Sequence, residues 1–425
     1  MSKYTFVKVT SYLLAAKYLA PIFFKVLPSP LDLNMFWILI WCASLFLFYP
    51  RILANKALIP IYIWAIYFIV IIGLFRKQES YIDLYYQKHF ISWLASITIA
   101  MFYLIIATKN DLFIFIKINL ILILFSCLST IIGLQIFPEA VRFNYLSAVS
   151  PYSIEQGIAR SDFFQSIGIQ PYGFFYGLAI IIPPIVYYLL NMKHLLRSKN
   201  NKIKMLTAIS IIYISFIQAN YATAFLLAAV GIILAFIGYR RFTKYKYVAY
   251  ILLGLMFFTP SSWIADTILE VSNVAENNSI LQKRLIDLSH TLSGEEDTHV
   301  SARLDRIPLL IENFLSSPIW GTGVELSHNF LFDVLSAFGL IGLSMYFLVF
   351  FKFYKYNVKI FDRQSAFYFF LVFLLFAIYA PLKGGPGGIM YYFIFALSPL
   401  FIYIIQYNKA NHLNQTEQSK FNRVA

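Results

Sequence analysis

The chain has 425 residues, of which 60% are hydrophobic and only 13% are charged. Soluble proteins carry about 25% charged residues, so this chain has too little polar surface to cover a fold in water. This composition and a mean hydropathy of +0.70 exclude soluble enzymes, disordered chains and disulfide scaffolds. They predict an all-α integral membrane protein with a single polytopic domain over residues 1–425.

A membrane-spanning helix needs about 20 mostly apolar residues, and the chain offers twelve such runs. In chain order they are 10–28, 33–49, 57–75, 89–107, 112–134, 168–190, 203–219, 222–238, 247–263, 328–351, 366–382 and 389–407. No cleavage site of small residues follows the first run, so we expect it to be retained as a span. Lys17 and Lys25 interrupt it and are expected to extend to the membrane surface or to face the protein interior.

The net charge of +14 follows from the arrangement of the loops. Twelve spans make the loops alternate between two sides, and 21 of the 34 Lys and Arg residues fall on one side. That side holds both termini and the loops near 50–56, 108–111, 191–202, 239–246 and 352–365. Basic residues concentrate in cytoplasmic loops, so this side is predicted to be cytoplasmic. Nucleic acid, which a basic chain can also indicate, is therefore not an expected partner.

Two long loops fall on the opposite, external side: 135–167 and the large loop 264–327. Loops this long usually carry function or are disordered. The large loop contains two amphipathic stretches with apolar residues at helical spacing. The first covers 280–292, and the second places Leu304, Ile307, Ile311, Phe314 and Leu315 on one face. Helices of this type lie in the membrane interface or cap a cavity, and Pro308 is compatible with such a helix if it begins near Asp305.

The large loop ends in a motif that leads into the next span. It combines an arginine, a proline, a G-x-G triplet, a His-Asn pair and two further glycines, namely Arg303, Pro318, Gly321, Gly323, His328, Asn329, Gly339 and Gly342. The same span contains Asp333, whose insertion costs roughly 2.5–3.5 kcal/mol, so it is expected to face protein or water. In the other external loop, Arg160 lies close to the start of a span.

This pattern resembles the signature of the O-antigen polymerase and O-antigen ligase superfamily of membrane glycosyltransferases. The segment from Arg160 through Gly168 and Pro171 is similar to the family's other arginine-bearing loop. One feature of some polymerases, an arginine eleven residues before a glycine, is absent, because Pro171 follows Arg160 and Phe314 follows Arg303 at that distance. The resemblance implies a GT-C-like fold of about twelve transmembrane helices in the bacterial inner membrane, with a large, partly helical external loop.

The resemblance also implies the reaction: transfer of a glycan from an undecaprenyl-diphosphate carrier to an acceptor hydroxyl outside the cytoplasm. Arginine forks suit the oxygens of the leaving diphosphate, so Arg160 and Arg303 are predicted to bind substrate and act in catalysis, with Arg306 as a secondary contact. His328 is predicted to be the base for the acceptor hydroxyl, with Asn329 beside it in substrate binding.

No cofactor and no metal are predicted, since the chain has no D-x-D pair and no histidine pair at metal-binding spacing. The predicted enzyme is a metal-independent glycosyltransferase. Its expected partners are the undecaprenyl-diphosphate-linked oligosaccharide and membrane lipid, and the resemblance adds a flippase and a chain-length regulator. Cys42 and Cys127 lie in apolar runs and are expected to be inert thiols.

Polymerase is the preferred function, and the ligase that moves the finished chain to the lipid A core is the nearest alternative. A flippase would be expected to show related halves and charges along several spans, whereas charge here concentrates in the external loops. A non-catalytic assembly partner would not need the Arg and His residues. Structural roles also stay open: headgroup contacts for Arg160 and Arg303, helix capping for His328, and a polar pairing for Asp333.

Reporter fusions test the predicted topology. Fusions after Lys204 and Lys246 should report a cytoplasmic location, and a fusion near Gly294 should report an external one. Reporter enzymes that are active on only one side of the membrane provide the measurement. A cytoplasmic signal at Gly294 would contradict the topology and would place the predicted site on the wrong side.

Overall fold

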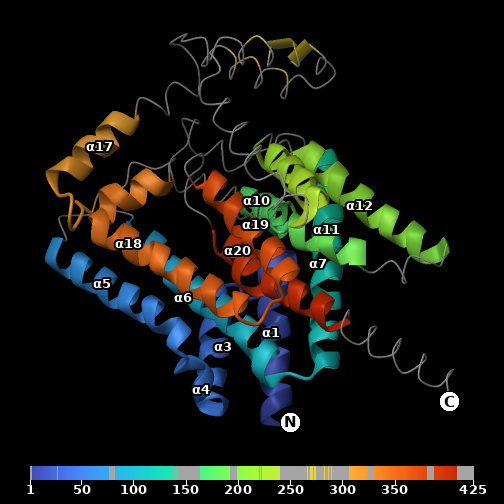
Figure 1. Cartoon of the computed structure of the whole chain (residues 1–425), viewed down its shortest axis with the longest axis horizontal. Helices are drawn as coiled ribbons and strands as arrows, with labels where there is room; N and C mark the ends of the chain where they lie inside the picture. The colour runs from blue at the N-terminus through green and yellow to red at the C-terminus, as the bar shows by residue number, and fades with distance from the viewer. Residues whose placement is uncertain are drawn as a thin grey trace.

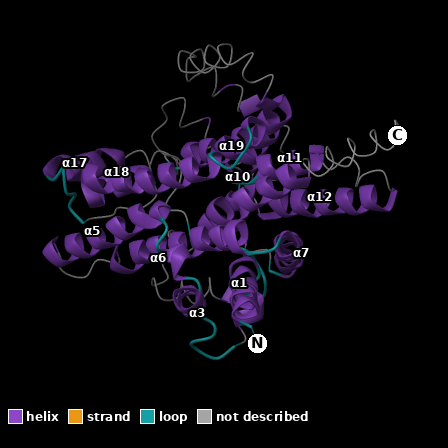
Figure 2. Ribbon diagram, turned by 60° about the horizontal axis from the view of Figure 1, so that its bottom comes forward, coloured by secondary structure: helices purple, strands orange, loops and turns teal. Residues whose placement is uncertain are grey.

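The computed structural model describes residues 2–25, 27–75, 82–137, 163–191, 199–219, 223–239, 306–323, 330–380 and 387–408, with isolated positions between them. Within these ranges the regular structure is entirely helical. The chain forms a bundle in which helices from both halves of the sequence interleave (Figures 1 and 2).

The named helices follow in chain order. They are α1 (Lys3–Leu19), α2 (Ile22–Lys25), α3 (Asn34–Phe48), α4 (Pro50–Leu53), η1 (Lys56–Leu58), α5 (Ile59–Phe75), α6 (Ile82–Met101), η2 (Phe102–Ile106), α7 (Lys109–Ile136), α10 (Tyr172–Ile180), α11 (Ile182–Asn191), α12 (Lys199–Ala219), α17 (Arg306–Ser316), α18 (Phe330–Val358), α19 (Arg363–Tyr379), α20 (Gly388–Tyr391) and η5 (Tyr392–Leu397). A further apolar helix covers Thr223–Tyr239, and α20 and η5 belong to a longer helix, Gly388–Asn408.

Every predicted span coincides with one or two of these helices, except 247–263, which lies outside the described residues. Three helices in the described part are long and apolar enough to cross a membrane: Lys109–Ile136, Phe330–Val358 and Gly388–Asn408. A fourth is present if α10 and α11, which meet at an angle of 45°, form one span. In the remaining helices of the described part, the apolar stretches cover 10–17 residues each, for example Phe90–Ile106 and Ile203–Ala219. The all-helical class is thus confirmed for these residues, while twelve crossings stay a prediction.

The first helix differs from its predicted span, 10–28, at both ends. It begins at Lys3 because the side chain of Ser2 accepts a hydrogen bond from the backbone N–H of Thr5 and caps the helix. It ends at Leu19, because Pro21 disfavours helical backbone at the preceding residue. The short helix α2 follows the break. The hydrophobic pattern alone located the apolar part of α1 but not its polar first turn.

The structure shows the surroundings of Lys17 and of the two cysteines, which all lie in predicted spans. Lys17 is only 3% exposed. Its Nζ donates to the backbone carbonyl of Asp32 and lies 5.4 Å from the centre of the Phe24 ring. Of the two predicted environments for this lysine, the structure therefore shows the protein interior. Both cysteines are free thiols; Cys127 is buried and Cys42 is partly buried.

An aromatic core fixes the helices that surround the candidate site. Trp93 of α6 is fully buried, with its ring centre 5.0 Å from that of Tyr346 on α18 and 5.5 Å from that of Tyr391 on α20. Trp64 of α5 lies 5.8 Å from Trp93. Such pairs each contribute about 0.5–1.5 kcal/mol beyond the apolar area they bury. The cluster holds α5 and α6 against α18.

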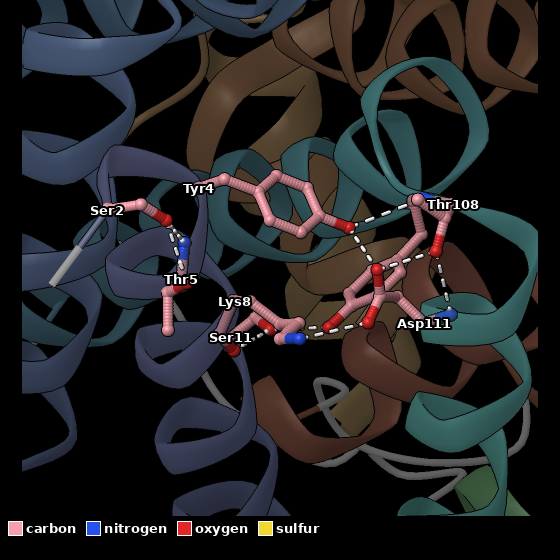
Figure 3. A network of polar contacts seen from close by, with 8 residues as sticks. Ser2, Tyr4, Thr5, Lys8, Ser11, Thr108 and Asp111 are labelled. Carbon is pink, nitrogen blue, oxygen red and sulfur yellow. Dashed lines mark hydrogen bonds and ion pairs between the residues drawn. The ribbon is translucent and has the colours of Figure 1, made fainter.

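Segments predicted to be cytoplasmic meet at one end of the bundle (Figure 3). The Tyr4 hydroxyl donates to Asp111 Oδ2 at 2.5 Å, and Lys8 Nζ donates to Asp111 Oδ1 at 2.9 Å. The hydrogen bond to Asp111 raises the pKa of Lys8. Lys109 donates to the hydroxyl of Tyr403 in the last helix. The chain start, the 108–111 loop and the end of the last helix are thereby joined, and α17 lies at the opposite end (Figure 1).

We expect Asp111→Asn to loosen α1 from α7, because the amide loses the charge that Lys8 contacts. Hydrogen bonds to charged groups contribute about 1.5–3 kcal/mol, so a loss of that order is expected. The midpoint of thermal unfolding in detergent provides the measurement. Glu312→Gln, at an exposed position of α17, is the control and should leave the midpoint unchanged. Equal midpoints for both variants would show that the ion pair does not hold α1.

Candidate functional site

The predicted site residues fall largely outside the described part of the chain. Those outside it are Arg160, Arg303, His328 and Asn329. Arg306 is the first residue of α17, and its backbone alone is described. Their roles therefore stay predictions. The structure does describe segments that flank them in the sequence: 168–171 after the Arg160 loop, and 318–323 and α18 on either side of the His-Asn pair. Within the described residues, no group of three or more His, Cys, Asp or Glu side chains could hold a metal ion.

Helix α18 is broken at Gly339. This residue has φ 62° and ψ −166°, a conformation that is essentially restricted to glycine. In a continuous helix, the N–H groups of Leu340 and Ile341 would donate to the carbonyls of Ser336 and Ala337. The break separates these two pairs. Each such group left unpaired in an apolar environment costs several kcal/mol, so another partner is required.

The segment 318–323, here called the inserted segment, supplies those partners. It provides two carbonyls for the separated N–H groups and two N–H groups for the separated carbonyls. The four backbone bonds are Leu340 N to Pro318 O at 2.9 Å, Ile341 N to Ile319 O at 3.2 Å, Thr322 N to Ser336 O at 2.9 Å and Gly323 N to Ala337 O at 3.0 Å. The end of the large loop is thus built into α18.

Two glycines of the predicted motif make this contact possible. A Cβ on Gly321, where φ is 81°, would overlap the backbone carbonyl of Ala337. A Cβ on Gly339 would overlap the carbonyl of Ile319. Each glycine therefore lets the opposite chain approach at hydrogen-bonding distance. The sequence motif identified both positions, and the structure gives the physical reason for them.

Tyr67 of α5, which does not belong to the sequence motif, contacts both sides of the junction between the inserted segment and α18. Its hydroxyl donates to the carbonyl oxygen of Phe338 at 2.8 Å, and the carbonyl oxygen of Trp320 also accepts from it at 3.2 Å. The Tyr67 ring stacks on the Trp320 indole, with ring centres 6.4 Å apart. Sequence analysis missed Tyr67 because it is one of 31 tyrosines and belongs to no motif.

The inserted segment and the start of α18 flank the His-Asn pair of the motif in the sequence. Residues 324–329 connect Gly323 to Phe330, the first residue of α18. Gly323 is bonded to Ala337, which follows Phe330 by seven residues, or about 10 Å along a helix. Both residues that flank this connection, Gly323 and Phe330, are therefore held on α18, and residues 324–329 between them lie outside the described residues. Below it, Asp333 is buried in the first turn of α18, where the helix dipole favours a carboxylate.

The segment that follows the Arg160 loop is anchored in a related way. Gly168 has φ 92°, and its carbonyl accepts a hydrogen bond of 2.8 Å from the Ser129 hydroxyl of α7. The Gln170 N–H donates to Thr130 Oγ1 at 3.1 Å, and Pro171 then caps the start of α10. The buried Gln170 amide has no hydrogen-bond partner of its own in this part of the structure. The segment that follows the Arg160 loop is thus held at a fixed point on α7.

Helix α17 confirms the second predicted amphipathic stretch as a helix. It begins at Arg306, so Pro308 falls in its first turn, as predicted. Among its described side chains the buried one is Leu310, at 2% exposed, which was not on the predicted face. Ile311 and Leu315 of the predicted face are exposed instead, at 41% and 66%. An apolar face that turns away from the protein favours a location in the membrane interface.

A comparison of the sequence with known families finds a match over part of the chain. Residues 205–347 match the model of the family described as O-antigen ligase. The match contains α17, the inserted segment and the break in α18. It confirms the resemblance to the O-antigen polymerase and ligase superfamily, whose members are glycosyltransferase-like membrane enzymes of surface polysaccharide synthesis. No curated protein matches the chain.

Alanine at either facing glycine should destabilise the protein, because the methyl group overlaps backbone that cannot move without losing hydrogen bonds. We expect Gly321→Ala and Gly339→Ala each to cost about 2–4 kcal/mol. Thermal unfolding in detergent and the yield of monodisperse protein give the measurement. Gly387→Ala is the matched control: its φ is −74° and its Cβ would meet nothing within 4 Å. A loss for Gly387→Ala as large as for the other two would refute the role of the junction.

Proposed function

We propose that this protein is a surface polysaccharide polymerase of the O-antigen type. It transfers an undecaprenyl-diphosphate-linked glycan chain to a lipid-linked repeat unit on the outer face of the bacterial inner membrane. The observation that carries this proposal is the family match over 205–347, because it covers the segment in which the motif glycines join the large loop to α18.

In the proposed reaction, the acceptor hydroxyl attacks the anomeric carbon of the donor glycan. The bond from that carbon to the diphosphate breaks, and undecaprenyl diphosphate leaves as an anion. Arg160 and Arg303 stabilise the negative charge through bidentate contacts, with Arg306 as a further contact. His328 takes the proton of the acceptor hydroxyl, and Asn329 orients the acceptor. The proposed chemistry uses neither a metal nor a cofactor.

The arrangement of the bundle supports an external site. The inserted segment and α17 lie at the end opposite the Tyr4–Asp111 contact (Figure 1). With both termini in the cytoplasm and twelve crossings, that opposite end faces outward, where lipid-linked repeats are presented. A flippase would then deliver the substrate, and a chain-length regulator would set the extent of polymerisation.

A ligase is the second candidate, and one observation favours it: the matching family model is itself described as O-antigen ligase. In this case the donor and the leaving group are the same, and the acceptor is a sugar of the lipid A core. The two functions share the arginine contacts and the base, and they differ in the acceptor alone.

The deciding experiment supplies purified protein with a synthetic undecaprenyl-diphosphate-linked repeat, with and without lipid A core. A polymerase yields carrier lipid with two or more repeats in the absence of core. A ligase yields glycan on the core alone. Folded protein that transfers glycan to neither acceptor would reject both functions.

Variants in this assay test the proposed roles. His328→Ala should lower the transfer rate by about 10²–10⁴-fold while donor lipid still binds. Arg160→Lys and Arg303→Lys should weaken donor binding and rate, because lysine keeps the charge but not the bidentate fork. Arg284→Lys, in the same large loop but outside the motif, is the control and should behave as the unmodified protein. A His328→Ala protein that retains most of its rate would exclude the base assignment.

A further inference from the structure

We infer that the starts of α10 and of the last helix, Gly388–Asn408, form with Gln170 a binding site for the diphosphate of a lipid-linked glycan. The inference rests on the proposed function. A polymerase joins two lipid-linked glycans and therefore holds two diphosphates, of which Arg160 and Arg303 are proposed to bind the one that leaves. The site at the helix starts takes the other one, which belongs to the acceptor.

The first observation is that the two helices run side by side in the same direction. A Cβ on Gly173 would lie 3.2 Å from Ile389 Cγ2, and a Cβ on Gly177 would lie 2.4 Å from Phe393 Cδ2. From the first contact to the second, both helices advance by four residues, so they are parallel. Glycines at this spacing let two helix backbones approach closely. The two helix starts therefore lie next to each other (Figure 1).

The second observation is that neither helix start has a side-chain cap or a negative charge. The N-cap residues are Pro171 and Gly387, neither of which makes a side-chain cap, and neither first turn contains an acidic residue. The first N–H groups of a helix have no partner within it, and its dipole places about half a positive charge there. Two parallel neighbours bring two such charges together, and an anion bound between them would offset their repulsion.

The third observation is the side chain of Gln170, the residue before the N-cap of α10. It is 1% exposed, and among the described residues neither its Nε2 nor its Oε1 has a hydrogen-bond partner. Its backbone N–H is bonded to Thr130 of α7, so the side chain originates at a fixed point beside the first turn of α10. A buried amide without partners is costly, which indicates a ligand that the protein itself does not supply.

The position and the chemistry of these groups fit a lipid diphosphate. The last helix ends near the Lys109–Tyr403 contact, at the predicted cytoplasmic end, so its start lies at the external end. Pro171 and Gly387 are partly exposed there, with Gln170 buried beside them. The N–H groups and Gln170 Nε2 can donate to phosphate oxygens. Gln170 Oε1 can accept from a hydroxyl of the sugar that carries the diphosphate.

Gly387→Asp tests the site, because it supplies an anion of the protein's own. Gly387 has φ −74° and ψ 165°, the extended conformation usual for an N-cap, so an aspartate there would cap the last helix and compete with phosphate. Leu33→Asp is the matched control. Leu33 is the N-cap of α3, has no side-chain cap either, and is 49% exposed. Both variants add one carboxylate at an uncapped helix start, so they share any general effect of charge.

The first measurement is the binding of undecaprenyl diphosphate without glycan to purified protein in nanodiscs. The background carries Arg160→Ala and Arg303→Ala, which removes the proposed arginine contacts. We expect Gly387→Asp to weaken the remaining binding by about ten-fold or more, and Leu33→Asp to keep it within about two-fold. Equal binding by these two variants, or no binding by the background itself, would overturn the inference.

Gln170→Leu separates a ligand contact from a structural role at nearly constant volume. We expect binding to weaken by about five-fold or more, while the thermal midpoint without ligand stays the same or rises, because a buried amide without partners is lost. Binding equal to that of the background protein would exclude Gln170 from the site. A lower midpoint without ligand would show that the amide supports the fold instead.

Competition identifies the lipid, and transfer assays separate this inference from the proposed function. An excess of phosphatidylglycerol should leave the binding of undecaprenyl diphosphate unchanged; displacement by it would assign the site to a phospholipid headgroup and overturn the inference. If Gly387→Asp, in protein with both arginines, transfers glycan at the unmodified rate, the acceptor site is wrong and the polymerase function stands. If the binding results are as expected but no glycan is transferred, the proposed function fails and the diphosphate site stands.

Discussion

The interruption of α18 is the constraint on which the candidate site depends. In an apolar environment, backbone groups that a helix releases must find partners within the protein. Gly339 releases them, and the inserted segment pairs with all four. The requirement works in both directions: the helix needs the segment to satisfy its broken turn, and the segment needs the helix for its own backbone. This mutual dependence makes the segment at the end of the large loop, which is predicted to be external, part of the helical core.

The same physical solution occurs where the other external loop re-enters the bundle. There a glycine with positive φ, Gly168, brings the chain close to α7, and the hydroxyls of Ser129 and Thr130 bond to its backbone. At both points a glycine permits a close approach and side-chain hydroxyls complete the pairing. Each arginine-bearing loop of the predicted site is therefore followed by a segment that is held at a fixed position in the bundle.

Composition and hydrophobic runs were sufficient to predict the helical class and the position of nearly every apolar helix, and the motif identified the glycines of the junction. They could not show why those glycines matter, because the contact between Gly321 and Ala337 arises only when a loop folds back on a later helix. Tyr67 could not be identified from the sequence, because it belongs to no motif and its contact partner Phe338 lies 271 residues away in the chain. The buried side of α17 was missed for a similar reason. Which face of a helix is buried depends on the elements that pack against it, and the spacing of apolar residues did not predict that Leu310 would be buried.

The position of Tyr67 has a consequence for how the family domain is understood. The match that defines the domain begins at residue 205, yet α5 ends at Phe75. A hydroxyl that completes the central break of the domain thus comes from far outside its boundaries. The domain is a unit of sequence similarity and not an independent unit of structure. We therefore expect exchange of this segment between related proteins to depend on whether an early helix of the recipient offers a hydroxyl at the corresponding position, as α5 does here.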